Sequence, residues 1–308
     1  MSTAADRPAV PPFTGMALDR ASTERKDPEW VRAQLAEPGS RVIAAGSDGL
    51  LVADGDAPEL VRLAVDNDEI AEPILLGLEG GDAVFGLDVE ALAPDARRVA
   101  IDGHRFMSLR EAGTEMAPAE AGLAAYVMAM LNWHRRHRFC ANCGNPTDVV
   151  EGGYERRCPR CGAHHFPRTD PVVIMTVEYD DQLLLGRRTG WPEGRLSVLA
   201  GFVSPGESAE EAVSREVQEE SGIVARDPVF VASQPWPFPA SLMLGFHAVS
   251  DGGEPRATDG ELDEVHWLSR DAIVEAINGG DPGFQLPGSV SIARFLIDRW
   301  AQGAQVNL

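Results

Sequence analysis

The sequence of 308 residues predicts an α+β protein with an N-terminal β-rich domain, a small cysteine-rich module and a C-terminal domain of strands and helices. Three observations lead to this fold class. Short apolar runs separated by Gly, Asp, Asn and Pro occupy residues 41–101, a pattern typical of a small antiparallel sheet. All four cysteines fall within residues 140–161. Beyond residue 171, apolar runs of strand length precede an acidic segment with helical periodicity.

Changes in composition divide the chain into four segments. Residues 1–40 combine Pro and charge without strong alternation, so we expect a loose arm leading to a first element. Residues 41–117 form the β-rich domain, residues 118–168 a linking helix with the cysteine module, and residues 169–308 the C-terminal domain. Nothing in the β-rich domain indicates catalysis. Its expected strands are Arg41–Ala45, Leu50–Ala53, Leu60–Val65, Ile74–Leu78, Ala83–Leu87 and Arg98–Ile101.

The overall charge excludes some classes of partner. With 27 Lys and Arg against 48 Asp and Glu, the formal charge is −21, which disfavours general attraction to DNA, RNA or anionic membranes. No stretch approaches the roughly 18 apolar residues that a membrane span needs, and the first ten residues lack a signal-peptide pattern. We therefore expect a cytoplasmic protein without DNA or membrane partners.

A helix is predicted over Pro118–His137, where Ala, Leu and Met are frequent and no proline interrupts the run. It ends in a cationic cluster, which either complements the negative end of the helix or contacts phosphates. The cluster begins a basic island, since residues 135–168 hold seven Arg against three acidic residues. This island is the one plausible place for a nucleic acid or polyphosphate, unless its arginines simply offset acidic neighbours.

The four cysteines predict a structural zinc site. They form two Cys-x-x-Cys turns with fourteen residues between them, each followed by Gly: Cys140, Cys143, Cys158 and Cys161. Two such turns let four thiolates surround one tetrahedral ion, and a closed shell of four leaves no position for substrate. A redox dithiol pair would use the same residues but would leave the paired spacing to coincidence. An iron site is the other alternative, and the zinc-ribbon pattern argues against it.

An acidic segment follows the expected strands Val172–Val177, Gln182–Gly186 and Leu199–Val203, and it predicts a metal-binding helix. A helix over Ser208–Ser221, ended by Gly222, places Glu216 and Glu220 in the middle of its apolar face, with Glu219 at the flank. Such carboxylates repel one another by about 1 kcal/mol in water and by more at lower dielectric, so a divalent cation is needed to offset them. Oxygen ligands favour Mg2+ or Mn2+, and metal-assisted attack of water on a phosphate follows as the reaction class.

The residues around this helix resemble the Nudix hydrolase box with every fixed position filled: Gly201, five residues, Glu207, seven residues, Arg215-Glu216-Val217, one residue, Glu219-Glu220, one residue, Gly222-Ile223. The resemblance implies an α/β/α sandwich that cleaves a nucleoside diphosphate linked to another group. It implies that Glu216, Glu219 and Glu220 bind metal and that Glu220 or Glu219 is the base. Arg215 and Glu207 are implied to support the loop.

A proline-aromatic motif beyond the helix bears on the substrate. Prolines at alternate positions stiffen Ser233-Gln234-Pro235-Trp236-Pro237-Phe238-Pro239-Ala240-Ser241. Two rings held with little freedom suit stacking on a heteroaromatic base, and they equally suit a surface loop or an interface anchor.

This motif is similar to the signature of NADH pyrophosphatases, a Nudix branch that also carries a four-cysteine zinc ribbon. The resemblance covers residues 41–302 and implies hydrolysis of NADH or NAD+ to AMP and nicotinamide mononucleotide by a homodimer. Removal of NAD caps from RNA is implied as a secondary activity. The resemblance adds two metal ligands: Glu261, which is preferred over Glu264, and the Ala200 carbonyl. Its implied substrate contacts are Arg110, Phe166, Gln234, Pro235, Trp236, Pro237, Phe238, Pro239, Ala240, Ser241 and Ala293.

Two other functions stay open at this point. A different Nudix hydrolase would cleave ADP-ribose, nucleoside triphosphates or diadenosine polyphosphates, but the proline-aromatic motif argues against it. The other alternative is a zinc-ribbon RNA-binding protein that senses nucleotides. The complete box argues against it, because a sensor would not need every metal-binding glutamate.

Overall fold

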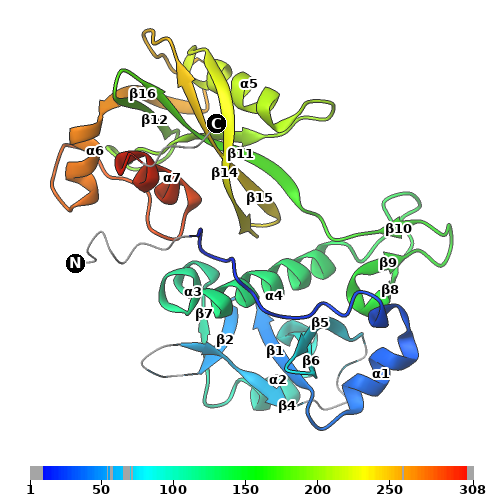
Figure 1. The fold of residues 1–308 in the computed structure, drawn as a ribbon. Helices are drawn as coiled ribbons and strands as arrows, with labels where there is room; N and C mark the ends of the chain where they lie inside the picture. Colours follow the sequence, from blue (N-terminus) through cyan, green and yellow to red (C-terminus); the bar gives the residue numbers. More distant parts are fainter. Residues whose placement is uncertain are drawn as a thin grey trace. The chain divides into compact units, whose positions relative to one another are not determined.

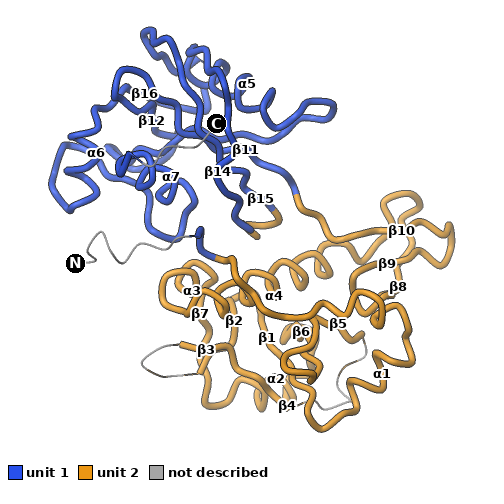
Figure 2. The backbone as a smooth tube through the Cα atoms, in the orientation of Figure 1, with its two compact units in different colours: residues 1–12, 170–235, 241–308 blue, residues 13–169, 236–240 orange. Residues whose placement is uncertain are grey.

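The computed structural model describes residues 10–53, 55, 58–64, 70, 72–258 and 260–303. The chain divides into two compact units, distinguished in Figure 2. Unit 1 consists of Asp170–Pro235 and Ser241–Leu308 with the N-terminal segment up to Pro12, and unit 2 consists of Phe13–Thr169 with Trp236–Ala240. Residues 1–9 of the expected arm and Val65 of one expected strand lie outside the described residues.

Unit 2 contains a seven-stranded sheet formed by the β-rich segment (Figure 1). Its strands are β1 (Arg41–Gly46), β2 (Gly49–Ala53), β3 (Glu59–Leu60), β4 (Arg62–Ala64), β5 (Ile74–Glu79), β6 (Asp82–Asp88) and β7 (Arg105–Met107). The order is β3-β2-β1-β6-β5, with β4 paired to β1 and β7 paired to β2. Buried Ile43, Leu51 and Phe85 place its core on these strands.

Two expectations for this sheet are wrong. Strand β1 pairs with β6 in parallel, so the sheet is mixed rather than antiparallel. Residues 98–101, expected as a strand, form the second half of helix α2 (Pro94–Ile101). A short apolar run fits either a strand or a helix, and Pro94 at the start, with its fixed φ, favours the helix.

The other helices of unit 2 are α1 (Pro28–Ala36), α3 (Leu109–Glu115) and α4 (Pro118–Arg136), with short 3-10 turns η2 (Glu24–Lys26), η3 (Val89–Ala91) and η4 (Glu151–Gly153). Helix α1 lies in the segment expected as a loose arm, and the Asp27 side chain caps it. Helix α4 confirms the helix predicted from Pro118 to within one residue. No helix in the described ranges is both long and apolar enough to cross a membrane.

The cysteine module forms a separate three-stranded sheet within unit 2. Its strands are β8 (Asp148–Val150), β9 (Glu155–Arg157) and β10 (His164–His165), in the order β10-β9-β8. All pairs are antiparallel, as expected for a ribbon built from hairpins.

Unit 1 is an α/β/α sandwich around a six-stranded sheet. The strands are β11 (Asp170–Tyr179), β12 (Gln182–Arg188), β13 (Leu199–Phe202), β14 (Ala225–Trp236), β15 (Ser241–Ser250) and β16 (Leu262–Ser269), and the helices are α5 (Ala209–Ser221), α6 (Arg270–Ile277) and α7 (Ile292–Ala301). Alternate residues of β11 face opposite layers, so Val173 packs toward α5 and Ile174 toward α6 and α7. The predicted C-terminal fold is confirmed.

Candidate active site and zinc site

Helix α5 carries the acidic residues of the candidate active site, and local sequence fixes both of its ends. The Ser208 side chain accepts a hydrogen bond from the Glu211 N–H (3.2 Å), and the Glu211 carboxylate accepts one from the Ser208 N–H (2.7 Å), forming a capping box. Gly222 adopts a φ of 71°, which ends the helix. Buried Val213 and Val217 then hold one face of α5 against the sheet.

Two glutamates of α5 point inward, as the helical periodicity predicts. Glu220 is 4% exposed and the side chain of Glu216 is 14% exposed, whereas that of Glu219 is 52% exposed. Burying an ionised carboxylate is costly unless positive charge or hydrogen-bond donors compensate. The inward carboxylates of α5 therefore need positive charge or hydrogen-bond donors beside them.

Gly201 makes room for the Glu216 carboxylate. A Cβ atom on Gly201 would lie 1.9 Å from Cδ of Glu216 and 2.1 and 2.2 Å from its two oxygens. Gly201 follows Ala200 in β13, which pairs with β11. The structure therefore brings the Glu216 side chain directly against the strand that carries Ala200, whose carbonyl is a predicted metal ligand.

Arg215 connects three of the box carboxylates. It donates to Glu207 from Nε (2.9 Å) and Nη2 (2.5 Å), and from Nη1 to Glu216 and Glu219 (2.8 Å each). Its Nη2 also donates to the Phe202 carbonyl at 3.0 Å. The hydrogen bond from Arg215, followed by one from the Ser204 N–H, lowers the pKa of Glu207 to about 2. Glu207 and Arg215 thus tie the loop before α5 to the helix, and their role in catalysis stays a prediction.

The pKa of Glu216 reflects its burial and the charges of its neighbours, among them Glu261. Burial raises the pKa of Glu216, Arg215 opposes this effect, and the charges of Glu219 and Glu261 raise it again. The Glu261 carboxylate, from the segment before β16, therefore lies close enough for its charge to act on Glu216. In contrast, the Glu264 carboxylate is engaged by Arg187, whose hydrogen bond is the largest cause that lowers the pKa of Glu264.

These groups fit a divalent cation by their chemistry. Carboxylate and carbonyl oxygens are the ligands that Mg2+ and Mn2+ take in proteins, and here they are partly buried and of one charge. In the part of the chain that the structure describes, the four cysteines are the one group of three or more ligand-type side chains that already converges on a point. Glu216 and Glu219 of α5 and Glu207 before the helix are instead held around Arg215.

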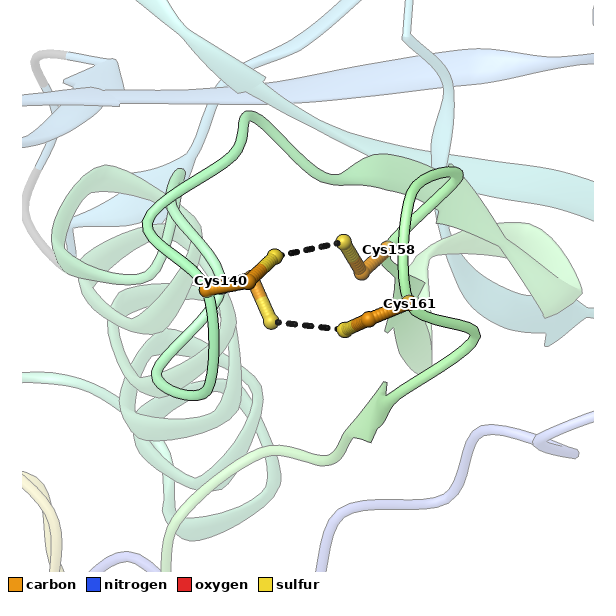
Figure 3. Close-up of side chains that lie close together, drawn as sticks. Cys140, Cys158 and Cys161 are labelled. Carbon is orange, nitrogen blue, oxygen red and sulfur yellow. Dashed lines mark hydrogen bonds between the residues drawn. The ribbon is translucent and has the colours of Figure 1, made fainter.

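The four cysteines form the predicted zinc site (Figure 3). All four sulfur atoms lie within 4.8 Å of one another, and Cys140–Cys161 and Cys143–Cys158 are each 3.5 Å apart. Tetrahedral zinc with Zn–S bonds of about 2.3 Å requires sulfur separations near 3.8 Å, so the observed separations are compatible with four thiolate ligands on one zinc ion. None is in a disulfide.

The two cysteine turns share one backbone geometry. Gly144 and Gly162 adopt φ values of 71° and 72°, and their N–H groups donate to the carbonyls of Cys140 and Cys158. An L-residue with a Cβ rarely adopts this conformation, which explains the glycine after each turn. Sequence reasoning missed His165, whose Nε2 lies 3.3 Å from Sγ of Cys140. Its position four residues after the last cysteine was the available signal.

The proline-aromatic motif is divided between the two units. Gln234 in unit 1 is fully buried: its amide donates to the carbonyls of Pro12 (3.1 Å) and Val290 (2.8 Å) and accepts from the Ile292 N–H (2.8 Å). Pro235 follows it in the same unit. The Gln234 side chain thus fixes the backbone before α7, and its predicted contact with substrate stays a prediction.

In unit 2 the two rings of the motif lie beside Arg110. The ring centroids of Trp236 and Phe238 are 4.8 Å apart, and the Arg110 guanidinium lies 4.5 Å from the Phe238 centroid and 5.2 Å from that of Trp236. Phe13, to which the sequence assigned no role, also packs on both rings. Arg110, which is distant in sequence, is thereby brought beside Trp236 and Phe238 of the motif. Pro237, Pro239 and Ala240 lie in the same segment of unit 2 as the two rings.

The remaining predicted contacts occupy separate places. Phe166, after the ribbon, is 62% exposed and stacks on His164. Ser241 begins β15 opposite Asp170, and Ala293 is buried in the first turn of α7.

Several arginines of the basic island are engaged within unit 2. Arg135 forms a bidentate salt bridge with Asp88 (2.7 and 2.8 Å), and Arg157 forms a salt bridge with Glu155 (3.0 Å). Arg156 is buried and donates to Thr147. These contacts favour the interpretation that part of the island offsets neighbouring groups.

Comparison with known proteins places this architecture in a family. Residues 167–284 match the NUDIX domain, residues 135–166 the NADH pyrophosphatase zinc ribbon domain, and residues 32–133 the NADH pyrophosphatase-like rudimentary NUDIX domain. A Mycobacterium bovis protein described as "NAD-capped RNA hydrolase NudC" is 38% identical over 306 residues, covering 95% of each chain. The chain belongs to the NADH pyrophosphatase branch of the Nudix family.

Other members of this branch agree with the assignment. The Mycobacterium tuberculosis protein of the same description is also 38% identical over 95% of each chain. The human "NAD-capped RNA hydrolase NUDT12" is 34% identical over 94% of this chain and 72% of its own length. The resemblance inferred from the Nudix box and the cysteine spacing is confirmed, as is the zinc ribbon.

Proposed function

We propose that this protein hydrolyses the pyrophosphate of NADH or NAD+, giving AMP and reduced or oxidised nicotinamide mononucleotide, and that it removes NAD caps from RNA. The single observation that carries the proposal is the inward-facing carboxylate set of α5, built from a complete Nudix box. The descriptions of full-length relatives as NAD-capped RNA hydrolases support the choice of substrate.

We propose that Glu216, Glu219, Glu220 and Glu261, with the Ala200 carbonyl, hold Mg2+ or Mn2+. Such a cation would neutralise phosphate charge and acidify or orient a water molecule. Glu220 or Glu219 then accepts the proton of the attacking water, since a carboxylate within reach of that water is a suitable general base. Arg215 keeps Glu216 and Glu219 in place through its hydrogen bonds.

We propose that the aromatic residues recognise the nucleotide base of the substrate. Trp236 and Phe238 present rings with few rotatable bonds, and Arg110 adds positive charge beside them. Phe166 and the backbone at Ala293 are the further proposed contacts, together with the rest of the motif from Gln234 to Ser241.

We also propose that the protein is a cytoplasmic homodimer in which the zinc ribbon is structural. The proposed segment boundaries are 41–117, 118–168 and 169–308.

A panel of substrates tests the proposal against its alternatives. NADH, NAD+, ADP-ribose, a nucleoside triphosphate and a diadenosine polyphosphate are compared by kcat/KM with Mg2+ or Mn2+. The proposal predicts that NADH or NAD+ ranks first. Preference for ADP-ribose would identify another Nudix hydrolase, whereas saturable RNA binding without any hydrolysis would favour a nucleotide sensor.

A further inference from the structure

A β-bulge lies immediately beside Glu261, the predicted metal ligand outside the Nudix box. Strands β12 and β16 pair in register from Gln182↔Ser269 to Arg187↔Glu264, and the next pair is Arg188↔Leu262. Asp263 is therefore an extra residue on β16 without a partner on β12. Bulges are frequent beside active sites, where they change the direction of a nearby side chain.

Two side chains hold the bulged residue: Arg187 near the end of β12 and Thr189 directly after the strand. Asp263 accepts a hydrogen bond from Arg187 Nη1 at Oδ2 (2.7 Å) and one from Thr189 Oγ1 at Oδ1 (2.8 Å). The Thr189 hydroxyl also lies 3.3 Å from the Gly260 carbonyl, but it has one proton, and the closer carboxylate is the better acceptor. Arg187 Nε also donates to Glu264 at 2.5 Å, so Arg187 holds the carboxylates of both the bulged residue and the residue after it.

The same short segment holds the backbone of Glu261. The Thr189 N–H donates to the Glu261 carbonyl at 2.9 Å. Thr189 thus binds both the main chain of Glu261 and the side chain of the bulged Asp263. A displacement of Asp263 would rotate the chain at Glu261, which lies two residues before it and one residue before the last β16 pair, Arg188↔Leu262.

We infer that Asp263, held by Arg187 and Thr189, is a positioning residue that directs the Glu261 carboxylate toward the metal-binding carboxylates of α5. The inference rests on the proposed function, because it takes Glu261 as a metal ligand. Asp263 acts through Glu261 and touches neither metal nor substrate. Groups that orient metal ligands in this way typically change metal affinity by about 10- to 100-fold when they are removed.

If Asp263 had a purely structural role, its loss would lower stability and metal affinity together. The Arg187–Asp263 pair is partly exposed, with side chains 19% and 35% accessible, and such pairs add little to stability. Loss of Asp263 should therefore leave the melting temperature nearly unchanged. A large effect on metal binding at unchanged stability is specific to positioning.

The test measures Mn2+ binding to the full-length, zinc-loaded protein without substrate, using the electron paramagnetic resonance signal of free Mn2+. For Asp263→Asn we expect Mn2+ affinity to fall on the order of 10-fold. Thr189→Val should act in the same direction, while Thr189→Ser, which keeps the hydroxyl, restores affinity. Asp251→Asn is the matched control, because Asp251 pairs with Arg226 on the exposed surface of the same unit.

Glu261→Gln separates the inference from the proposed function. Weak Mn2+ binding in both Glu261→Gln and Asp263→Asn, at unchanged melting temperature, supports positioning through Glu261. Wild-type affinity in Asp263→Asn while Glu261→Gln binds weakly overturns the positioning role and leaves the proposed function intact. Wild-type affinity in Glu261→Gln overturns the inference through its premise, and absence of Mn2+ binding by the wild type overturns the proposed function as well.

Discussion

Replacement of Gly201 by alanine tests the geometry of the carboxylates that we propose to bind metal. The new Cβ would lie 1.9 Å from Cδ of Glu216, whereas such contacts essentially never fall below 3.0 Å. The carboxylate must therefore move by about 1 Å or more, and a displacement of this size in a reacting group costs on the order of 100-fold in rate. This corresponds to about 2.7 kcal/mol of transition-state stabilisation. The atom that gives way is the end of a flexible side chain, so the fold should survive.

The assay compares kcat for NADH and the melting temperature of Gly201→Ala with those of the wild type. Gly288→Ala is the matched control, because no atom lies within 4 Å of a Cβ at Gly288 and its φ is not in the left-handed region. We expect the Gly201 variant to lose about 100-fold in kcat with little change in melting temperature, and the control to match the wild type. Wild-type kcat in Gly201→Ala would refute the role of Glu216.

Three further predictions address the base, the zinc and a buried histidine. Glu220→Gln should lower kcat by orders of magnitude with an unchanged circular dichroism spectrum, and normal turnover would remove Glu220 from the site. Cys158→Ser should release zinc to a chromogenic chelator and lower the melting temperature, since structural zinc contributes to folding; a variant that keeps both would refute the structural zinc site. Burial and the Arg156 charge lower the pKa of His134 from 6.5 to about 4. The unfolded chain therefore takes up the proton first as pH falls, and the free energy of unfolding should drop by about 2 kcal/mol between pH 7.5 and pH 5. Denaturant titrations of wild type and His134→Gln should show a shallower pH dependence for the variant, and equal slopes would contradict the assignment.

Helix α5, which carries the candidate active site, could be predicted from the sequence because its determinants are local. Ser208 as the cap, Gly222 as the end and the 3.6-residue period fix which face of α5 is buried. The inward position of Glu216 and Glu220 follows from that period alone. The cysteine turns are equally local, since each depends on four consecutive residues and the glycine that follows.

Features that depend on long-range pairing could not be predicted. The parallel pairing of β1 with β6 and the bulge at Asp263 depend on strand register, which is set by contacts between distant segments. Burial of the Gln234 amide likewise depends on backbone groups of Pro12 and Val290. The strand expected at residues 98–101 was wrong because a short apolar run has no distinctive period.

Product analysis of NADH incubated with the protein and Mn2+ tests the central claim most directly. Cleavage at the pyrophosphate predicts AMP and reduced nicotinamide mononucleotide in equal amounts, separated by chromatography. Release of nicotinamide with ADP-ribose, or intact NADH after prolonged incubation, would contradict the proposed reaction.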